Sequence, residues 1–258
     1  VLMDHQDFDP HMKQVCDGAY QYGDRVFGCW NTQGHGKVDL TSAIAQSCDI
    51  YFYRTIQYYD IDKLAKYFYN FGFGNIAGLD IEGEAKGTIP TKAYMDKRYG
   101  RFGWSTGALL NFSIGQGEIL VTPIQVLNYT NILATRGNTF KPHLVRSDVL
   151  IENKDSLIPD EAWDRIIFDM GQVVSHQNGT GKNADPLING VDVYGKTGTA
   201  ENPHGEDHAW FIGWMSFLDN NYSIVVLLEN AGSGGAVAAP IAKTVFNNII
   251  SLNNMASK

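Results

Sequence analysis

Three strand-like segments follow one another near the carboxyl end of the chain, separated only by short turns. They span residues Val191–Ala200, His208–Phe217 and Tyr222–Glu229, and they are rich in β-branched and aromatic residues. Parallel neighbours need a long crossover connection, so these short turns indicate antiparallel pairing. A helical pattern over residues 234–253 follows the third segment. We therefore predict an antiparallel sheet with a helix laid over it.

The remainder of the chain is mainly helical in pattern. Residues 1–38 read as an irregular loop, and residues 75–120 as glycine-rich and irregular. Between and after them we predict helices over residues 38–47 (capped by Asp39 or Thr41), 50–59, 60–74, 122–137 and 156–176. The fold class is therefore α/β of the α+β type.

Charge and hydropathy exclude several classes of protein. A net charge of −8 leaves no basic surface for nucleic acid. The apolar runs stay far below the roughly 20 residues that span a membrane. No signal peptide is visible, and the sequence begins at Val1 without a start methionine. We therefore expect a piece of a longer protein, whose targeting segment lies elsewhere.

The first strand carries an unusual polar run, Lys196-Thr197-Gly198-Thr199. Gly198 has no side chain, so another backbone or a ligand can approach the strand closely there. A lysine and two hydroxyls then surround that position, beside the unpaired N–H groups of a strand edge. This arrangement suits a ligand carboxylate that lies along the edge, although a solvated lysine on an exposed strand would show the same residues.

Two further serine-containing patterns bear on this run. Ser47-Cys48-Asp49 interrupts the helical pattern and forms an S-x-[ND] triplet far upstream of Lys196. K-T-G, S-x-x-K and S-D-N together make up the set found in β-lactamases and penicillin-binding proteins. The third member, S-x-x-K, is absent, because no serine of the chain has a lysine three residues later.

Three cysteines and a histidine are spaced as Cys16-x12-Cys29-x5-His35-x12-Cys48. An odd number of cysteines leaves one thiol outside any internal disulfide. Two interpretations stay open: one disulfide with a spare thiol, or a tetrahedral Cys3His zinc site. Glycines on both sides of His35 free the backbone to turn its ring inward, which favours zinc.

Four ordered segments, GHGKVDLTSAIAQSCDIYFY, GLDIEGEAKGTIPT, IGQG…TPIQ and YGKTGTAE, resemble one known family across essentially the whole chain. The chain resembles the transpeptidase domain of class B penicillin-binding proteins, most closely the elongation-specific penicillin-binding protein 2 subfamily. The resemblance implies that residues 1–258 form the carboxyl-terminal part of a single domain with the penicillin-binding/β-lactamase-like fold, whose amino-terminal part with the nucleophile helix is missing. We divide that domain into an irregular metal-binding region (1–48), a helical part (39–190), and the strands with the last helix (191–258).

The resemblance also implies a chemistry. Such enzymes cross-link peptidoglycan: a serine attacks the D-Ala-D-Ala end of a stem peptide, and β-lactams acylate that same serine. Ser47 would relay a proton, with Asp49 orienting it, and Lys196 would supply positive charge. Thr197 and Thr199 would hold the substrate carboxylate beside Gly198. The Thr199 N–H would serve the oxyanion hole.

Trp210, directly after the turn that follows the first strand, is a further candidate for the peptide groove. In the family, S-x-x-K begins a helix shortly before the position of Val1. We therefore expect that the nucleophile belongs to a missing amino-terminal part. The alternatives are a non-catalytic wall-peptide sensor or scaffold with this fold and, less favoured, a β-lactamase or D,D-carboxypeptidase.

Cofactor, partners and location follow from the same resemblance. Some members of the subfamily bind zinc through two aspartates, a histidine and a cysteine; His35 and Cys48 match directly, and Cys16 and Cys29 fall about where the aspartates stand. The expected partners are stem peptides, β-lactams and a glycan-strand polymerase of the elongation machinery. The expected location is the periplasmic face of a bacterial inner membrane, reached through an anchor absent from this sequence.

Overall fold

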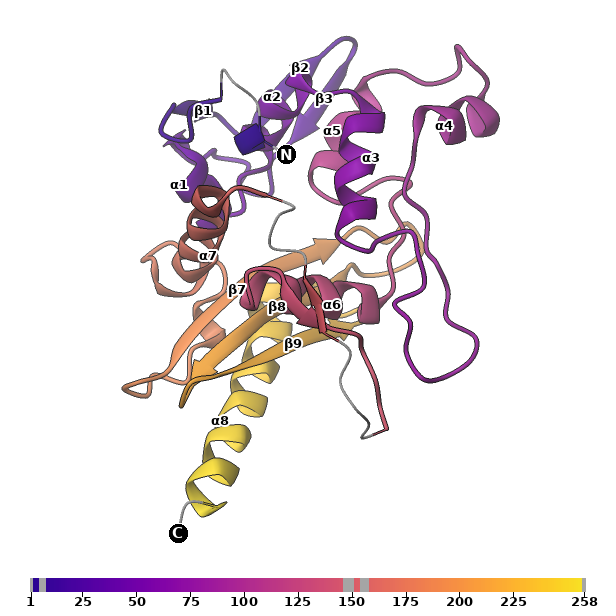
Figure 1. Cartoon of the computed structure of the whole chain (residues 1–258). Coiled ribbons are helices and arrows are strands. Elements are labelled where there is room, and N and C mark those ends of the chain that lie inside the picture. Colours follow the sequence, from indigo (N-terminus) through magenta and orange to yellow (C-terminus); the bar gives the residue numbers. More distant parts are fainter. Residues whose placement is uncertain (1, 5–7, 146–150, 154–157, 257–258) are drawn as a thin grey trace. The chain divides into compact units, whose positions relative to one another are not determined.

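The computed structural model describes residues 2–4, 8–145, 151–153 and 158–256 (Figure 1). The chain divides into two compact units. Unit 1 comprises Val1–Ala43, Cys48–Gln125 and Phe140–Leu150, and unit 2 comprises Ile44–Ser47, Val126–Thr139 and Ile151–Lys258. Within the described residues, no helix combines the length and hydropathy that a membrane crossing requires.

Unit 1 begins with short strands in two antiparallel pairs, β1 with β4 and β2 with β3. The prediction of an irregular loop over residues 1–38 was therefore wrong in part. Each strand has only three or four residues, too few for the alternation of a half-buried strand to stand out. The strands are β1 (Gln14–Cys16), β2 (Ala19–Tyr22), β3 (Arg25–Gly28) and β4 (Gly36–Val38).

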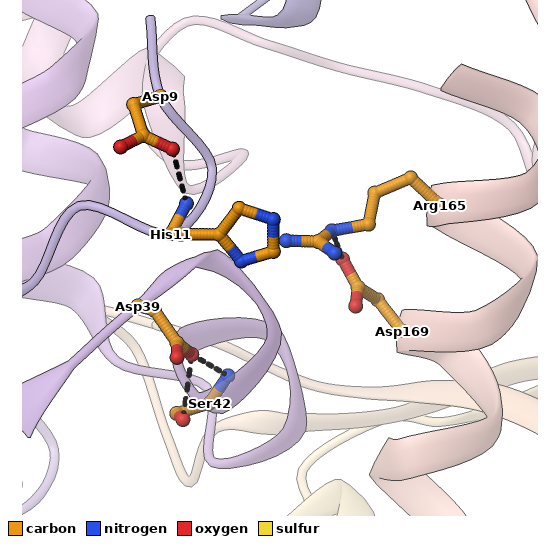
Figure 2. Close-up of polar contacts among 6 residues, drawn as sticks. All are labelled: Asp9, His11, Asp39, Ser42, Arg165 and Asp169. Carbon is orange, nitrogen blue, oxygen red and sulfur yellow. Dashed lines mark hydrogen bonds and ion pairs between the residues drawn. The ribbon is translucent and has the colours of Figure 1, made fainter. Parts of the chain in front are cut away.

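Helices follow the strands in unit 1. Asp39 caps the first, because its carboxylate accepts the Ser42 N–H at 2.9 Å and the Ser42 hydroxyl at 2.7 Å (Figure 2). Two helices, α4 and α5, lie in the stretch that we predicted to be irregular, and Thr91 caps α4 through the N–H of Tyr94. The elements are α1 (Leu40–Ala45), α2 (Asp49–Thr55), η2 (Ile56–Tyr58), α3 (Ile61–Asn70), α4 (Lys92–Tyr99) and α5 (Gly107–Ser113), after a first turn η1 (Leu2–Asp4).

The hydrogen bonds of the Gln125 side chain explain why a glutamine stands in the first turn of the TPIQ helix, α6 (Pro123–Ala134). The side chain is buried, and its Nε2 donates to the carbonyls of Asn75 (2.6 Å) and Lys86 (2.8 Å). Its Oε1 accepts the N–H of Thr122 at 2.8 Å. One amide thus satisfies the backbone of two otherwise irregular segments of unit 1.

Unit 2 is built on the antiparallel sheet β7-β8-β9, as the short turns predicted. Phe211 and Met215 of β8 are fully buried on one face, where they pack in one cluster with Phe246 of α8. Tyr194 and Trp214 stack on the other face with ring centroids 4.9 Å apart. The elements are β7 (Asp192–Ala200), β8 (His208–Phe217), β9 (Asn220–Leu228) and α8 (Ala239–Ala256).

Further elements flank this sheet in the sequence. Helix α7 (Asp160–Ser175) carries an ion pair between Arg165 and the fully buried Asp169, with Nε and Oδ2 3.5 Å apart (Figure 2). A 3-10 turn η4 (Lys182–Ala184) follows it, and a π-helical turn η5 (Gly234–Ala238) precedes α8. A short pair, β5 (Asn138–Phe140) with β6 (Ile151–Asn153), lies between α6 and α7 in the sequence.

Candidate functional site

The backbone at the end of α1 places Ser47 in a conformation that side chains rarely adopt. The N–H of Cys48 donates to the Ala43 carbonyl (2.8 Å) and the N–H of Ser47 to the Ile44 carbonyl (3.3 Å). This pairing is a Schellman motif, which requires a left-handed residue at the position that Ser47 fills. Its φ is indeed 54°. Glycine is the usual residue there, so a serine suggests that the hydroxyl is needed.

The Lys196 ammonium lies beside that hydroxyl. Nζ donates to Ser47 Oγ at 2.7 Å and to the Thr197 carbonyl at 2.9 Å, although 149 residues separate the lysine from the serine. The fold of unit 2 therefore brings Ser47 beside the K-T-G run, which the sequence keeps far apart. A cation within hydrogen-bond distance stabilises negative charge on the hydroxyl oxygen, as a proton relay requires.

Thr197 and Thr199 stand on the opposite face of β7 from Lys196, because side chains alternate along a strand. Thr197 is half-buried and donates to Thr180 Oγ1 at 2.7 Å. Thr199 is exposed. In the sheet that the described residues form, β7 is an outer strand, so an extended peptide can align with its free side.

Gly198 is approached by backbone. A Cβ placed on Gly234 would lie 2.3 Å from the Gly198 carbonyl and 2.2 Å from that of Trp210. Trp210 pairs with Gly198 in the sheet register and is half-buried there. Another chain segment therefore packs closely on Gly198, and this packing requires glycine at position 234, whereas a Cβ on Gly198 itself would meet the Cβ of Trp210 at 3.2 Å.

Asp49 is the first residue of α2, and its Oδ2 accepts the N–H of Trp30 at 3.0 Å. This contact ties the start of α2 to the segment that carries Cys29. No motif predicts this contact, because a backbone partner is not visible in the residue types. An orienting effect of Asp49 on Ser47 stays a prediction.

The three cysteines and His35 converge within unit 1. Their candidate ligand atoms all lie within 4.8 Å of one another, and the thiols are free of disulfides. His35 Nδ1 is 3.5 Å from the Sγ atoms of both Cys16 and Cys29. Cys16 ends β1, and Cys48 is the residue before the first turn of α2. All three cysteines are almost completely buried.

Glycine makes the fold of this cluster possible. Gly34 has φ 79°, and a Cβ there would lie 2.3 Å from the Cys16 carbonyl. Gly18 has φ 91°, and a Cβ there would lie 2.2 Å from the Thr32 carbonyl. Two segments of backbone therefore pass each other closely and turn the four side chains to the same point.

A hydrogen bond between two of the thiols shifts their pKa values in opposite directions. A hydrogen bond with the Cys48 side chain lowers the pKa of Cys29 to about 4, although burial opposes this. The same hydrogen bond, together with burial, raises the pKa of Cys48. The hydrogen bond therefore favours the thiolate form of Cys29 and the thiol form of Cys48.

Sequence reasoning missed one residue of this region, Thr180. It lies in the NGTGK segment between α7 and η4, and its N–H donates to the Ala45 carbonyl at 3.1 Å. A threonine between two glycines is a weak signal, and only the fold brings it to Thr197.

Comparison with known proteins gives consistent results. A family model described as the penicillin binding protein transpeptidase domain matches residues 1–247. A curated Haemophilus influenzae protein, "Peptidoglycan D,D-transpeptidase MrdA", is 37% identical over 265 residues, which cover 93% of this chain and 40% of that protein. The chain therefore spans less than half the length of this relative.

Two solved structures have the same fold. One is a complex between penicillin-binding protein (PBP2) and MreC from Helicobacter pylori, with a TM-score of 0.82 and 27% identity over 93% of this chain and 46% of that one. The other is titled "Structural coordination of polymerization and crosslinking by a peptidoglycan synthase complex", with a TM-score of 0.83 and 28% identity over 95% of this chain and 43% of that one. The expected transpeptidase fold is thereby confirmed.

Proposed function

Because the chain belongs to the penicillin-binding protein transpeptidase family, we propose that it forms most of the catalytic domain of a peptidoglycan D,D-transpeptidase. The substrate would be a stem peptide ending in D-Ala-D-Ala. The reaction would release the last D-Ala and transfer the remaining acyl group to an amine of a second peptide.

The 2.7 Å contact between Lys196 Nζ and Ser47 Oγ carries this proposal. It supports a role for Ser47 as a relay that passes a proton to the leaving amine, with Lys196 stabilising the charge that develops. Thr197 and Thr199 would bind the terminal carboxylate at the free side of β7. The Thr199 N–H would donate to the oxyanion of the tetrahedral intermediate.

The nucleophile is assigned to a part of the longer protein outside these 258 residues. No serine of the chain has a lysine at the third following position, so Ser47 lacks the base that S-x-x-K supplies. A neighbouring base is what activates a serine at neutral pH. We therefore assign attack and deprotonation to an S-x-x-K segment that precedes Val1.

Intact-mass spectrometry with benzylpenicillin tests the assignment. The 258-residue chain should give no stable adduct. A longer version that includes the S-x-x-K serine should give one adduct per chain, which disappears when that serine is changed to alanine. A stoichiometric adduct on the short chain would contradict the assignment. A longer protein without S-x-x-K would point to the non-catalytic sensor.

We also propose that Cys16, Cys29, His35 and Cys48 hold one structural zinc ion. The Nδ1–Sγ separations of 3.5 Å equal those expected around a tetrahedral ion with Zn–S of about 2.3 Å and Zn–N of about 2.0 Å. Three thiolates and an imidazole leave no open position, so the ion would fold the segment and take no part in the reaction.

Elemental analysis of protein purified without added zinc should find about one zinc per chain. A thiol titration under denaturing conditions, before and after a chelator, should count three thiols. Cys16→Ser and His35→Ala should lose the metal, whereas His143→Ala, outside the cluster, should keep it. Absence of metal together with a single titrating thiol would establish one disulfide and a spare cysteine instead.

Partners and location belong to the longer protein. The two related structures include a complex with MreC and a peptidoglycan synthase complex, which supports the proposal of a glycan-strand polymerase and other elongation proteins as partners. We place the protein at the outer face of the bacterial inner membrane, held by a segment outside this chain. Co-purification of the full-length protein from membranes, with and without that segment, is the test.

A further inference from the structure

The segment around Thr180 is held in place by backbone hydrogen bonds on both sides. The Gly179 N–H donates to the His176 carbonyl at 2.8 Å, and the Gly181 N–H to the Val173 carbonyl at 2.9 Å. The Thr180 N–H donates to the Ala45 carbonyl at 3.1 Å. These contacts fix the Thr180 backbone against α7 and against Ala45, all within unit 2.

Close packing fixes the same residue from a second direction. A Cβ on Gly235 of η5 would lie 2.6 Å from the Thr180 carbonyl oxygen, so the two backbones are already in contact. Asn183 Nδ2 donates to the Gly235 carbonyl at 3.0 Å and holds that turn. The position of the Thr180 side chain is therefore set by its surroundings and does not depend on a bound ligand.

Two hydroxyls meet at this point. Thr197 Oγ1 lies 2.7 Å from Thr180 Oγ1 and donates to it. The Thr180 hydroxyl has a long contact with the Ala45 carbonyl, 3.5 Å, and that oxygen already accepts the closer Thr180 N–H. The Thr180 proton is thus weakly engaged and can turn, whereas the two oxygen positions are fixed.

This pair matters for carboxylate recognition, because a hydroxyl has one proton to give. While Thr197 donates to Thr180, it offers only lone pairs to the site and would repel a carboxylate. When Thr197 turns its O–H toward a carboxylate, its oxygen must accept a hydrogen bond in exchange. Thr180 is placed to donate that bond, and donors in a chain strengthen one another.

We propose that Thr180 is a positioning residue, which acts through Thr197 to select acyl donors with a free terminal carboxylate. Thr180 accepts from Thr197 in the empty site and donates to it in the occupied site. The inference rests on the proposed transpeptidase function, and it gives that function a carboxylate specificity determined by a residue outside the K-T-G run.

The test uses the longer protein with its S-x-x-K segment and measures second-order acylation rate constants for benzylpenicillin and for its methyl ester. In Thr180→Val, acylation by the acid should fall by about three- to tenfold, the cost of one hydrogen bond that supports a charged group. Acylation by the ester should be unchanged, so the preference for the acid shrinks. Thr180→Ser, which keeps the hydroxyl, should restore the preference.

Thr244→Val on α8 is the matched control, since its hydroxyl donates to the Pro240 carbonyl within the same helix and its loss should leave both rates unchanged. Equal losses for acid and ester, or no loss for either, would overturn the inference. If Thr180→Val does not fold, Thr180→Ala, which keeps the N–H contact to Ala45, is measured in its place. No adduct on the unsubstituted protein would instead refute the proposed function.

Discussion

The left-handed backbone of Ser47 predicts an inverted order of stability between two substitutions. At an ordinary helical position, a protein with alanine is more stable than the same protein with glycine by up to about 1 kcal/mol in unfolding free energy. At φ 54° the alanine Cβ meets the following carbonyl, which costs about 1–2 kcal/mol. Ser47→Gly should therefore unfold at higher denaturant than Ser47→Ala.

The magnitude follows from two opposing contributions. Relief of the Cβ contact favours glycine by about 1–2 kcal/mol, and the greater freedom of glycine in the unfolded chain offsets about 0.4–1 kcal/mol of this. We expect a net advantage of about 0.5–1 kcal/mol for glycine. Both variants lose the hydrogen bond with Lys196, so that loss cancels in the comparison.

Urea unfolding of the two variants in the same background measures the difference. The control pair is Ser251→Gly and Ser251→Ala, at an exposed position inside α8. There the free energy of unfolding of the alanine variant should be higher by about 1 kcal/mol. If Ser47→Ala equals or exceeds Ser47→Gly in stability, the serine is not held in the left-handed region. The role of the Schellman motif in presenting its hydroxyl would then be refuted.

Three further outcomes follow from contacts described above. Gln125→Leu should cost about 2–3 kcal/mol of unfolding free energy, because it leaves two backbone carbonyls and an N–H without their partner; a cost below 1 kcal/mol in urea unfolding would contradict this. Asp39→Ala should cost about 1 kcal/mol at neutral pH. Burial raises the pKa of Asp39, but the hydrogen bonds from Ser42 lower it by more, so the pKa is lower in the folded protein than in the unfolded chain. The cap therefore stabilises the fold at pH values above the unfolded-state pKa. The effect of Asp39→Ala should vanish as the pH falls through the folded-state pKa. Gly234→Ala should sharply lower the melting temperature, because its Cβ would meet two carbonyl oxygens at 2.2 and 2.3 Å, whereas Gly28→Ala, which meets nothing within 4 Å, should not.

The parts of the fold that the sequence predicted are those with local signals. The sheet of unit 2 followed from strand composition and short turns, and α6 from its cap and flanking glycine. The β2–β3 pair was missed, although Gly23 and Asp24 form a two-residue turn with a positive φ at Gly23, a recognised hairpin signal. Helices α4 and α5 were missed because the many glycines around them indicated irregular structure, although Thr91 is a clear cap for α4.

The candidate site divides in the same way. The cysteine–histidine spacing identified four residues that the structure places together, because their chemistry is visible in their side chains. Thr180 and the contact between Asp49 and the Trp30 N–H were invisible, because each depends on a backbone or hydroxyl partner that only tertiary folding supplies. Only the family resemblance predicted that Ser47 and Lys196 lie close together, because no periodic pattern in the chain links them.

The glycines of η5 have a consequence for how this protein can evolve. Gly234 and Gly235 abut the backbone beside Gly198 and Thr180 so closely that any side chain would displace main-chain atoms. In a population exposed to an inhibitor that binds along β7, single substitutions at these two glycines should be selected against, because they destabilise the fold. Adaptive changes should therefore collect at neighbouring positions whose side chains can vary, such as Trp210.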